Sequence, residues 1–262
     1  MAHQRFKHSG DLGDIIFSLP AIRALGGGVL YLDPNGGQHS PLVNWAAKTS
    51  TKLLLHLDPE SDQGIPVTEL PGKTRTNLNA ASIESLRPLL LRQDYIVDVQ
   101  PWQGETVEHD LDQFRQHNRF NNLSDSHLAA FGLPLTERDR AWITVDEPIT
   151  IDGRPIVIAR SPRYHGNFGF WESILPLIKD RCVYVGYPQE HEYFVYTFGH
   201  RVMHFPTPDI TTLARVIAGS RQFIGNVGLP HALAEAMKKD LINEIYRVNP
   251  TAMFQRSGAQ YV

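Results

Sequence analysis

The chain has 262 residues, of which 42% are hydrophobic and 20% charged, and this composition favours a packed core over a disordered or collagen-like chain. No apolar run approaches the roughly 20 residues that cross a bilayer, and the start of the chain lacks the apolar segment of a secretory signal. The single cysteine, Cys182, excludes an internal disulfide and a cysteine-cluster metal site, so we expect a cytoplasmic protein.

The net charge of −3 is divided unevenly along the chain. Residues 1–148 carry 13 Lys and Arg against 19 Asp and Glu, whereas residues 149–262 carry 12 against 9. A basic second half suits an anionic ligand that is held mainly by that half. Chance scatter of charge over solvated faces explains the same numbers equally well, so charge alone does not decide.

The first elements in chain order predict a βαβ unit. A strand is expected over residues 5–8, followed by a polar turn over 9–14 and an amphipathic helix over 15–25. Pro20 predicts a kink in this helix or a new start at the proline. A run of three glycines ends the helix, and a buried strand follows over 29–32. Strand, helix and strand in this order predict a parallel sheet.

The remaining sequence continues the alternation of helices and strands. Its middle is expected to hold helices over 40–57, 83–91 and 127–131, strands over 95–99 and 142–145, and polar loops over 59–80 and 102–126. The stretch 146–155, with two prolines and a glycine, is typical of a domain boundary. Beyond it we expect strands over 156–159, 182–185, 223–225 and 241–246, and helices over 168–179, 189–198, 209–219 and 229–238.

This pattern predicts two α/β domains, residues 1–148 and residues 149–262. Ligands of such sheets bind beyond the carboxyl ends of the strands. A cleft between the two domains is therefore the expected site.

The first candidate constellation is Ser9-Gly10-Asp11-Leu12-Gly13-Asp14, between the first strand and the first helix. Free N–H groups and the positive end of the helix dipole favour an anion or a polar substrate group there. The segment lacks the glycine spacing of a dinucleotide site and the Gly-Lys-Ser/Thr of a phosphate loop. Two interpretations stay open: the aspartates cap the helix, or Asp14 is a general base for an incoming hydroxyl.

Two further constellations follow strands of the second half. Arg160-Ser161-Pro162-Arg163-Tyr164-His165-Gly166 can grip a phosphate with two guanidinium groups and a hydroxyl, or it is an ordinary basic surface loop. In Gly225-Asn226-Val227-Gly228-Leu229-Pro230-His231, Gly228 lets the backbone approach a ligand, and the helix start offers N–H donors. His231 either adds a hydrogen bond to that ligand or has a structural role.

Metal and hydrolase motifs receive no support from the sequence. The 12 histidines include no pair at zinc spacing, and nothing resembles the Gly-x-Ser-x-Gly turn of serine hydrolases. The one Asp-x-Asp pair at a plausible turn is Asp110-Leu111-Asp112, in the polar stretch of the first half. We therefore expect no metal site.

The three constellations, in this order, resemble the bacterial lipopolysaccharide heptosyltransferase family, which has the GT-B glycosyltransferase fold. The opening HSGDLGDIIFSLPAIRAL is similar to that family's Ser-x-x-Gly-Asp start with its Leu-Pro-Ala helix. DYIVDVQ at 94–100 and HLAAFGLPL at 127–135 resemble a strand and a Leu-Gly-Leu-Pro segment of the family. LARVIAGSRQFIGNVGLPHALAEAM is similar to the donor-site stretch, and EIYRVNPT at 244–251 lies where the family carries a strand and a Gly-Pro-Thr-Asp-Pro loop.

The resemblance implies an α/β, GT-B-like fold of two Rossmann-like domains whose parallel sheets face a central cleft. It implies that Asp14 is the catalytic base, and it implies no cofactor and no metal. The expected donor- and phosphate-binding residues are Gly13, Arg160, Ser161, Arg163, Asn226, Gly228 and His231, and the expected acceptor-side residues are Ser9, Asp11 and Gln100. The expected partners are a nucleotide-diphosphate sugar, with ADP favoured, and a glycan or other hydroxyl-bearing acceptor.

Two departures from the family's pattern bear on function more than on fold. The family's Asp-Ser/Thr-Gly reads Asn226-Val227-Gly228 here, so a carboxylate and a hydroxyl are replaced. The chain is also shorter than is usual in the family. We therefore expect a reduced acceptor domain and no C-terminal helix packed back on the first domain.

The sequence thus predicts a metal-independent glycosyltransferase in which Asp14 deprotonates an acceptor hydroxyl. Two alternatives stay open. One is a non-catalytic sugar-nucleotide-binding protein of the same fold, which the Asn226-Val227 pair favours. The other is a glycosyltransferase that acts on a hydroxymethylated DNA base. A nucleic-acid partner calls for a basic groove, and the excess of acidic residues in 1–148 disfavours it.

Overall fold

The computed structural model describes residues 3–35, 78–117, 122–161, 164, 166–245 and 251–262. The predicted helix over 40–57 lies outside the described residues, as does nearly all of the predicted loop over 59–80.

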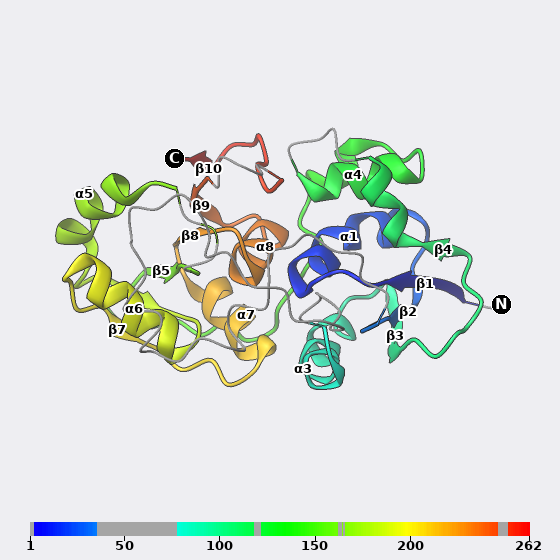
Figure 1. Ribbon diagram of the computed structural model, residues 1–262, viewed down its shortest axis with the longest axis horizontal. Helices are drawn as coiled ribbons and strands as arrows, with labels where there is room; N and C mark the ends of the chain where they lie inside the picture. The colour runs from blue at the N-terminus through cyan, green and yellow to red at the C-terminus, as the bar shows by residue number, and fades with distance from the viewer. Residues whose placement is uncertain (1–2, 36–77, 118–121, 162–163, 165, 246–250) are drawn as a thin grey trace, which may run out of the picture.

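Each half of the chain builds its own parallel sheet (Figure 1). The first sheet has the order β3-β2-β1-β4, and the second has the order β10-β9-β8-β5-β6-β7. The strands of the first sheet are β1 (Gln4–His8), β2 (Gly28–Leu32), β3 (Ile96–Pro101) and β4 (His109–Asp110). Those of the second are β5 (Ile156–Ala159), β6 (Cys182–Tyr184), β7 (Met203–His204), β8 (Gln222–Asn226), β9 (Asp240–Glu244) and β10 (Ala259–Tyr261).

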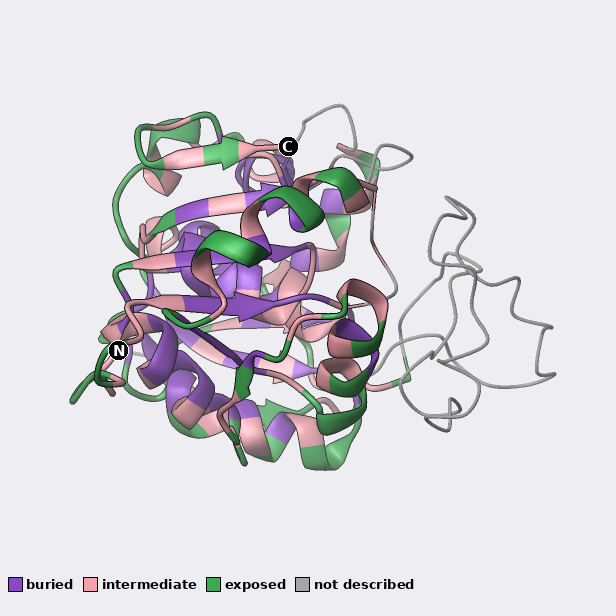
Figure 2. Ribbon diagram, turned by 90° about the vertical axis from the view of Figure 1, so that its left-hand side faces the viewer, coloured by how far each residue is buried: buried purple, intermediate pink, exposed green. Residues whose placement is uncertain are grey.

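Helices cover the sheets, so the strands are largely buried while most of the helices keep one face exposed (Figure 2). The helices of the first half are α1 (Leu12–Ala24), α3 (Ala80–Leu90), α4 (Leu123–Ala130) and the 3-10 turns η1 (Leu111–Gln116) and η2 (Leu135–Arg138). Those of the second half are α5 (Phe168–Ile178), α6 (Pro188–Phe198), α7 (Ile210–Gly219) and α8 (Leu229–Ala236). None of the helices in the described part of the chain is long and apolar enough to span a bilayer.

Most predicted elements of the described residues are present, and the prediction failed at short or unpaired ones. The strand expected over 142–145 is wrong: this segment joins neither sheet, and the Trp142 N–H donates to the Ala236 carbonyl at the end of α8. The two-residue strands β4 and β7, and β10 near the C-terminus, were not expected. Such short edge strands leave too few residues for a period-2 pattern to be read.

Helix α1 contains Pro20 and nevertheless runs without a break. A proline has no N–H, so the carbonyl of Ile16 lacks its usual helical donor. The indole Nε1–H of Trp142 donates to that carbonyl oxygen at 3.0 Å instead. The hydroxyl of Ser124 donates to the next carbonyl, that of Phe17, at 2.9 Å. Side chains from distant segments therefore donate to the carbonyls around the proline, and the helix continues through Pro20 without a new start.

A glycine turn closes the first βαβ unit. Gly27 has φ +74°, in the region that favours glycine, and a Cβ there would lie 2.2 Å from the Tyr95 carbonyl oxygen. The run of glycines that follows α1 therefore lets β2 pass close to the chain that enters β3.

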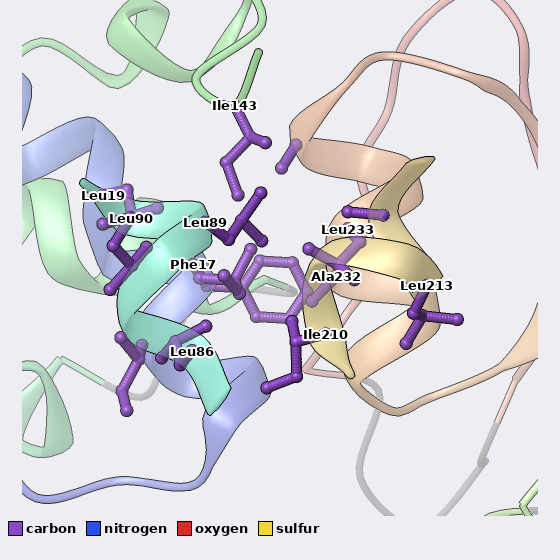
Figure 3. Packing of buried hydrophobic residues seen from close by; sticks show 14 of the residues in the cluster. Phe17, Leu19, Leu86, Leu89, Leu90, Ile143, Ile210, Leu213, Ala232 and Leu233 are labelled. Atoms are coloured by element: carbon purple, nitrogen blue, oxygen red, sulfur yellow. The ribbon is translucent and has the colours of Figure 1, made fainter. Parts of the chain in front are cut away.

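One hydrophobic core runs through both halves. Helix α1 packs against α8, and α3 packs against α7. Phe17 lies at the centre of this contact, with Leu89 of α3 on one side and Ile210 and Ala232 of the second half on the other (Figure 3). The first sheet ends at Asp110 and the second begins at Ile156, so the predicted boundary between residues 148 and 149 lies between the two sheets.

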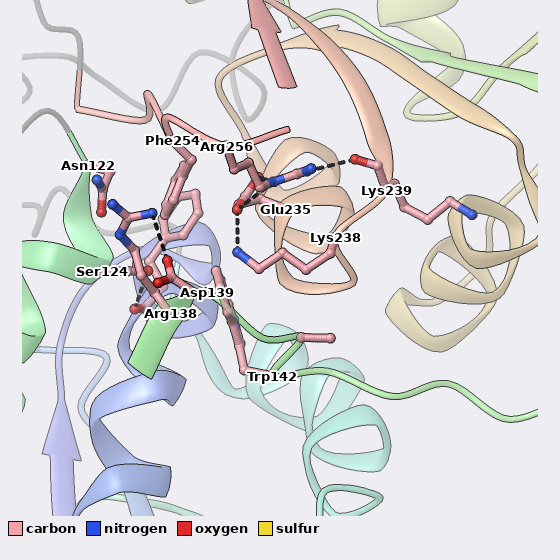
Figure 4. Close-up of polar contacts among 12 residues, drawn as sticks. Asn122, Ser124, Arg138, Asp139, Trp142, Glu235, Lys238, Lys239, Phe254 and Arg256 are labelled. Atoms are coloured by element: carbon pink, nitrogen blue, oxygen red, sulfur yellow. Dashed lines mark hydrogen bonds and ion pairs between the residues drawn. The ribbon is translucent and has the colours of Figure 1, made fainter. Parts of the chain in front are cut away.

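The segment from Thr251 to Ser257 returns from the second half to the first (Figure 4). Phe254 is fully buried and stacks on Phe17 with 5.3 Å between ring centroids. Arg256 pairs with the buried Glu235 of α8 at 2.9 Å, which ties the same segment to the second half. The sequence led us to expect that no C-terminal helix packs on the first half. In the structure a non-helical C-terminal segment makes a contact with that half.

The Trp142–Ile16 hydrogen bond yields a prediction about stability. Trp142→Phe leaves the Ile16 carbonyl buried without a donor, so we expect the free energy of unfolding to fall by about 2 kcal/mol. Urea denaturation measures the change. Trp102→Phe is the matched control, because the Trp102 indole donates to the Glu105 carbonyl in a partly exposed turn. Equal losses in the two variants contradict the role given to Trp142.

Candidate functional site

Two of the predicted constellations meet where α1 and α8 begin. A Cβ built on Gly13 lies 3.9 Å from the carbonyl carbon and oxygen of Gly228 and equally far from the Ala232 Cβ. Asp14 follows Gly13 directly, so its turn adjoins the start of α8. The N-terminal ends of two helices, each with a partial positive charge, thus come together at this point. Their meeting joins Asp14, Gly13 and Gly228, which lie far apart in the sequence.

Asp14 occupies the first turn of α1 and is partly buried. Its Oδ2 accepts a hydrogen bond from the Asp11 N–H at 3.2 Å. This is the helix-capping interaction that the sequence left open. Capping does not compete with a role as base, because a carboxylate has several acceptor positions on its two oxygens.

The turn that carries Asp14 is anchored by Asp112, which the sequence singled out only for its spacing from Asp110. Asp112 accepts from the Ser9 N–H at 3.2 Å, from Lys7 Nζ at 3.2 Å and from Arg115 at 3.3 Å. Burial alone raises the pKa of Asp112, but the Ser9 N–H and the cations hold it below its ordinary value. Asp112 is therefore an ionised anchor of the loop after β1. No sequence signal marks that role, because its partners come from two segments.

The acceptor-side residues divide into two places. Ser9 is buried and Asp11 is the N-cap of α1, so both adjoin Asp14. Gln100 is exposed in β3, which β2 separates from β1, and its amide donates to Asp98 at 2.7 Å. The structure thus brings Ser9 and Asp11 to Asp14 but leaves Gln100 two strands away.

Arg160 occupies a buried ion pair. It is 2% exposed, and its Nε and one terminal nitrogen donate to the Glu244 carboxylate at 2.7 and 3.0 Å. The guanidinium also lies over the Phe168 ring, with 4.8 Å to the centroid. This placement does not support the phosphate contact predicted for Arg160, because the guanidinium is paired with Glu244 inside the second half. The sequence could not reveal this pairing, because Glu244 lies on a distant strand.

Glu244 organises the start of α5. Besides Arg160, its carboxylate accepts from the Gly166 and Asn167 N–H groups at 2.6 and 2.8 Å and from the Trp171 indole at 2.8 Å. Burial raises the pKa of Glu244, but the charge of Arg160 and these hydrogen bonds lower it more. An internal carboxylate therefore already takes the N–H groups that lead into α5.

Asn226 binds the loop between β5 and α5 at the end that follows β5. Its Oδ1 accepts from the Ser161 N–H at 2.9 Å, and its Nδ2 donates to the carbonyls of Ser161, at 2.6 Å, and Tyr164. An ionised aspartate has no hydrogen to donate to those carbonyls. The replacement of the family's carboxylate by Asn226 therefore has a structural explanation, and Asn226 positions Ser161. Arg163 lies outside the described residues.

His231 lies in the first turn of α8 and is fully buried. Its ring is 6.1 Å from that of Phe17, and among the described residues neither of its ring nitrogens has a hydrogen-bond partner. Burial lowers its pKa to about 3, with a smaller contribution from Arg256. His231 is thus neutral at pH 7 and packs in the contact between α1 and α8. In the part of the chain that the structure describes, no three His, Cys, Asp or Glu side chains gather as metal ligands.

The buried ion pair leads to a prediction about stability and pH. Arg160→Ala leaves the Glu244 carboxylate buried without its counter-charge, so we expect a loss of about 3–5 kcal/mol in the free energy of unfolding. Because the pKa of Glu244 is lowered in the folded chain, the pair contributes fully above pH 4.5, and its contribution begins to decrease as the pH falls from that value toward the lowered pKa. Urea denaturation at pH 7 and pH 4 measures both effects, with the exposed Arg181→Ala as control. A loss under about 1 kcal/mol at pH 7 contradicts this role.

Asn226 gives a second prediction. Asn226→Asp sets a carboxylate against two carbonyl oxygens, so we expect about 2–3 kcal/mol of destabilisation at pH 7. Protonation at acidic pH restores one donor, and the difference from the natural chain then shrinks. Asn226→Ala lacks a titratable group, so its deficit stays constant over the same pH range. Denaturation curves of both variants from pH 4 to 8 measure this, and a pH-independent deficit in Asn226→Asp contradicts the donor role.

Comparisons with known proteins extend these findings. No family model and no curated protein matches the sequence. Among solved structures, E. coli heptosyltransferase WaaC with ADP-2-deoxy-2-fluoro heptose aligns over 98% of this chain and 92% of its own, with 11% identity and a TM-score of 0.51. The same enzyme with ADP aligns over the same shares, at 10% identity and a TM-score of 0.50. A family 9 glycosyl transferase from Veillonella parvula aligns over 100% and 86%, at 10% identity and a TM-score of 0.47. The two alignments with WaaC show that the chain has the α/β, GT-B-like fold of heptosyltransferases.

Proposed function

We propose that this chain is a glycosyltransferase that moves a sugar from a nucleotide-diphosphate donor to an acceptor hydroxyl, with Asp14 as the general base. The observation that carries the proposal is the meeting of the Asp14 turn with the start of α8, where a Cβ on Gly13 lies 3.9 Å from the backbone of Gly228. A base and an anion-binding helix end at one place are what transfer from a diphosphate donor needs.

The donor diphosphate binds at the start of α8 in this proposal. The N-cap is Gly228, which makes no side-chain capping bond, whereas Asn or Asp side chains cap α3, α4, α5 and α7. Pro230 has no N–H, and the Ala232 N–H donates to the Gly228 carbonyl at 3.0 Å. The phosphate donors in this proposal are therefore the N–H groups of Leu229 and His231, and the glycine lets phosphate approach the backbone. The fold shared with WaaC, whose structures hold ADP and an ADP-heptose analogue, makes ADP the favoured nucleotide.

The reaction is a single displacement at the anomeric carbon. Asp14 accepts the proton of the acceptor hydroxyl, the freed oxygen bonds to the anomeric carbon, and the bond to the diphosphate breaks. N–H groups and the helix dipole stabilise the charge that develops on the leaving diphosphate, and the proposal gives no step to a metal ion. Ser161 and Arg163 contribute from the loop after β5, while Arg160 and Asn226 act on that loop as its supports.

The structural role of Asn226 bears on the non-catalytic alternative. That alternative drew its support from the loss of the family's carboxylate at this position. The Asn226 side-chain amide donates to the Ser161 and Tyr164 carbonyls, and this structural role explains an asparagine at the position. Its presence is therefore compatible with a working donor site, and catalysis remains the favoured proposal.

Donor binding tests the proposal. Calorimetry with ADP, UDP, GDP and their sugar conjugates is expected to show selective binding of one diphosphate. Gly228→Ala should weaken that binding at least tenfold, about 1.4 kcal/mol, because a methyl group there blocks the approach of phosphate. The fold should tolerate the change, since φ is 164° and a Cβ lies 3.7 Å from the nearest side-chain atom, the Pro230 Cδ.

The controls separate binding from catalysis and folding. Gly169→Ala adds a methyl group at an exposed position of α5, so it should leave binding unchanged and should not lower the melting temperature. Asp14→Ala should keep donor binding and abolish transfer, and transfer by the natural chain should persist in EDTA. Full turnover by Asp14→Ala contradicts the general-base assignment. Binding without turnover by the natural chain favours the non-catalytic alternative.

A further inference from the structure

His8, the last residue of β1, lies directly under the Asp14 turn. It is fully buried, and its Nδ1 accepts a hydrogen bond from the Gly10 N–H at 2.8 Å. Gly10 in turn lies between the imidazole and the carboxylate. A Cβ built on Gly10 lies 2.6 Å from the His8 Cε1 and 2.8 Å from the Asp14 Oδ2. Imidazole, glycine and carboxylate therefore form one tightly packed stack.

The hydrogen bond requires His8 to be neutral. A protonated imidazole carries hydrogen on both nitrogens, so its Nδ1 cannot accept from an amide. Burial lowers the pKa of His8 to about 4; Asp112 opposes the shift, while Arg115 and Lys7 add to it. The remaining titratable neighbour is His127 of α4, whose ring centroid is 5.2 Å away and whose pKa burial also lowers. At neutral pH the proton therefore sits on Nε2 and Nδ1 is the acceptor.

Packing alone does not explain an imidazole at this position. The His8 ring belongs to an aromatic cluster with Phe114, at 5.8 Å, and His127. Among the described residues its Nε2 has no hydrogen-bond partner, although it is buried. A phenylalanine would fill the same space without burying an unpaired N–H, which costs free energy. What phenylalanine cannot do is accept the hydrogen bond from Gly10.

We propose that His8 is a positioning residue for Asp14: its Nδ1 holds the Gly10 N–H and so fixes the turn from which the Asp14 carboxylate acts. This inference rests on the proposed function, because the position of the Asp14 carboxylate matters for catalysis only if Asp14 is the general base. His8 itself does not touch the reacting atoms.

Two variants of His8 separate the hydrogen bond from the packing. His8→Phe keeps an aromatic ring and loses the acceptor, whereas His8→Asn places its Oδ1 near the position of Nδ1 and keeps the acceptor. Hydrogen exchange of the Gly10 amide and the carboxyl ¹³C titration of Asp14, both followed by NMR, need no substrate. We expect His8→Phe to speed exchange of the Gly10 amide at least tenfold and to move the titration midpoint of Asp14, while His8→Asn stays within about threefold and keeps the midpoint.

Turnover completes the test with the diphosphate sugar selected by calorimetry. His8→Phe should lower kcat at least tenfold with the donor Kd unchanged, and His8→Asn should retain most of kcat. In the natural chain, the ¹⁵N shifts of His8 should report the Nε2–H tautomer at pH 7, and protection of the Gly10 amide should fall as the pH drops through about 4.

The outcomes distinguish this inference from the proposed function. Unchanged Gly10 exchange and an unchanged Asp14 titration in His8→Phe overturn the positioning role, whatever Asp14→Ala does. Full turnover by Asp14→Ala overturns the general-base assignment, and the positioning role in catalysis falls with it even if the NMR coupling is present. If His8→Phe changes the NMR readouts but lowers kcat no more than His8→Asn does, the stack is structural only, and the inference is again overturned.

Discussion

Helices α1 and α8 approach one another at two glycines, and the surroundings of the candidate site follow from that contact. A side chain larger than alanine at Gly13 would meet the backbone of Gly228 or the Ala232 side chain. Because the contact is close, Phe17 and His231 are enclosed between the halves, and the two halves share one core. The same contact brings a carboxylate and an uncapped helix start together, which is the basis of the functional proposal.

The contact is held from outside by segments remote in sequence. Trp142 supplies the donor that Pro20 withholds from α1, and its own N–H is bound to the end of α8. Phe254 packs on Phe17 from the C-terminal side, while Arg256 pairs with Glu235 of α8. Trp142 and Phe254 contact both halves, and the Arg256–Glu235 pair fixes the segment that carries Phe254 to α8. The relative position of the two halves is therefore set by buried contacts rather than by a linker.

The two loops of the site are organised in the same way, each by a carboxylate from a neighbouring segment. Asp112 binds the Ser9 N–H and two cations after β1, and Glu244 binds two N–H groups and Arg160 after β5. A carboxylate with a full set of donors can stay ionised although buried. Such anchors fix loop geometry strongly, and the second anchor pairs with Arg160, which the sequence offered as a candidate for ligand binding.

The sequence predicted the elements well where the pattern was long. The helices around α5, α7 and α8 and the central strands β1, β5 and β8 follow from hydrophobic periodicity, capping residues and glycine turns, all of which are local. The strand predicted at Trp142 failed for the opposite reason: a short apolar run is buried equally well against a helix end as in a sheet. Of the proposed site, the sequence singled out Asp14 and Gly228 from their turns, but it gave no sign of the roles of Asp112, Glu244 and His8.

What the sequence by itself determined is therefore the order of the longer helices and strands, the parallel α/β class and the two glycine turns that carry Asp14 and Gly228. Local chemistry suffices for these, because caps, glycines and periodicity act within one or two turns of chain. Tertiary structure alone decided which charges are free for a ligand. Arg160 looked available beside a strand end, yet Glu244, 84 residues later, neutralises it inside the core. Pairing of that kind depends on which strands lie side by side, and no short stretch of sequence encodes it.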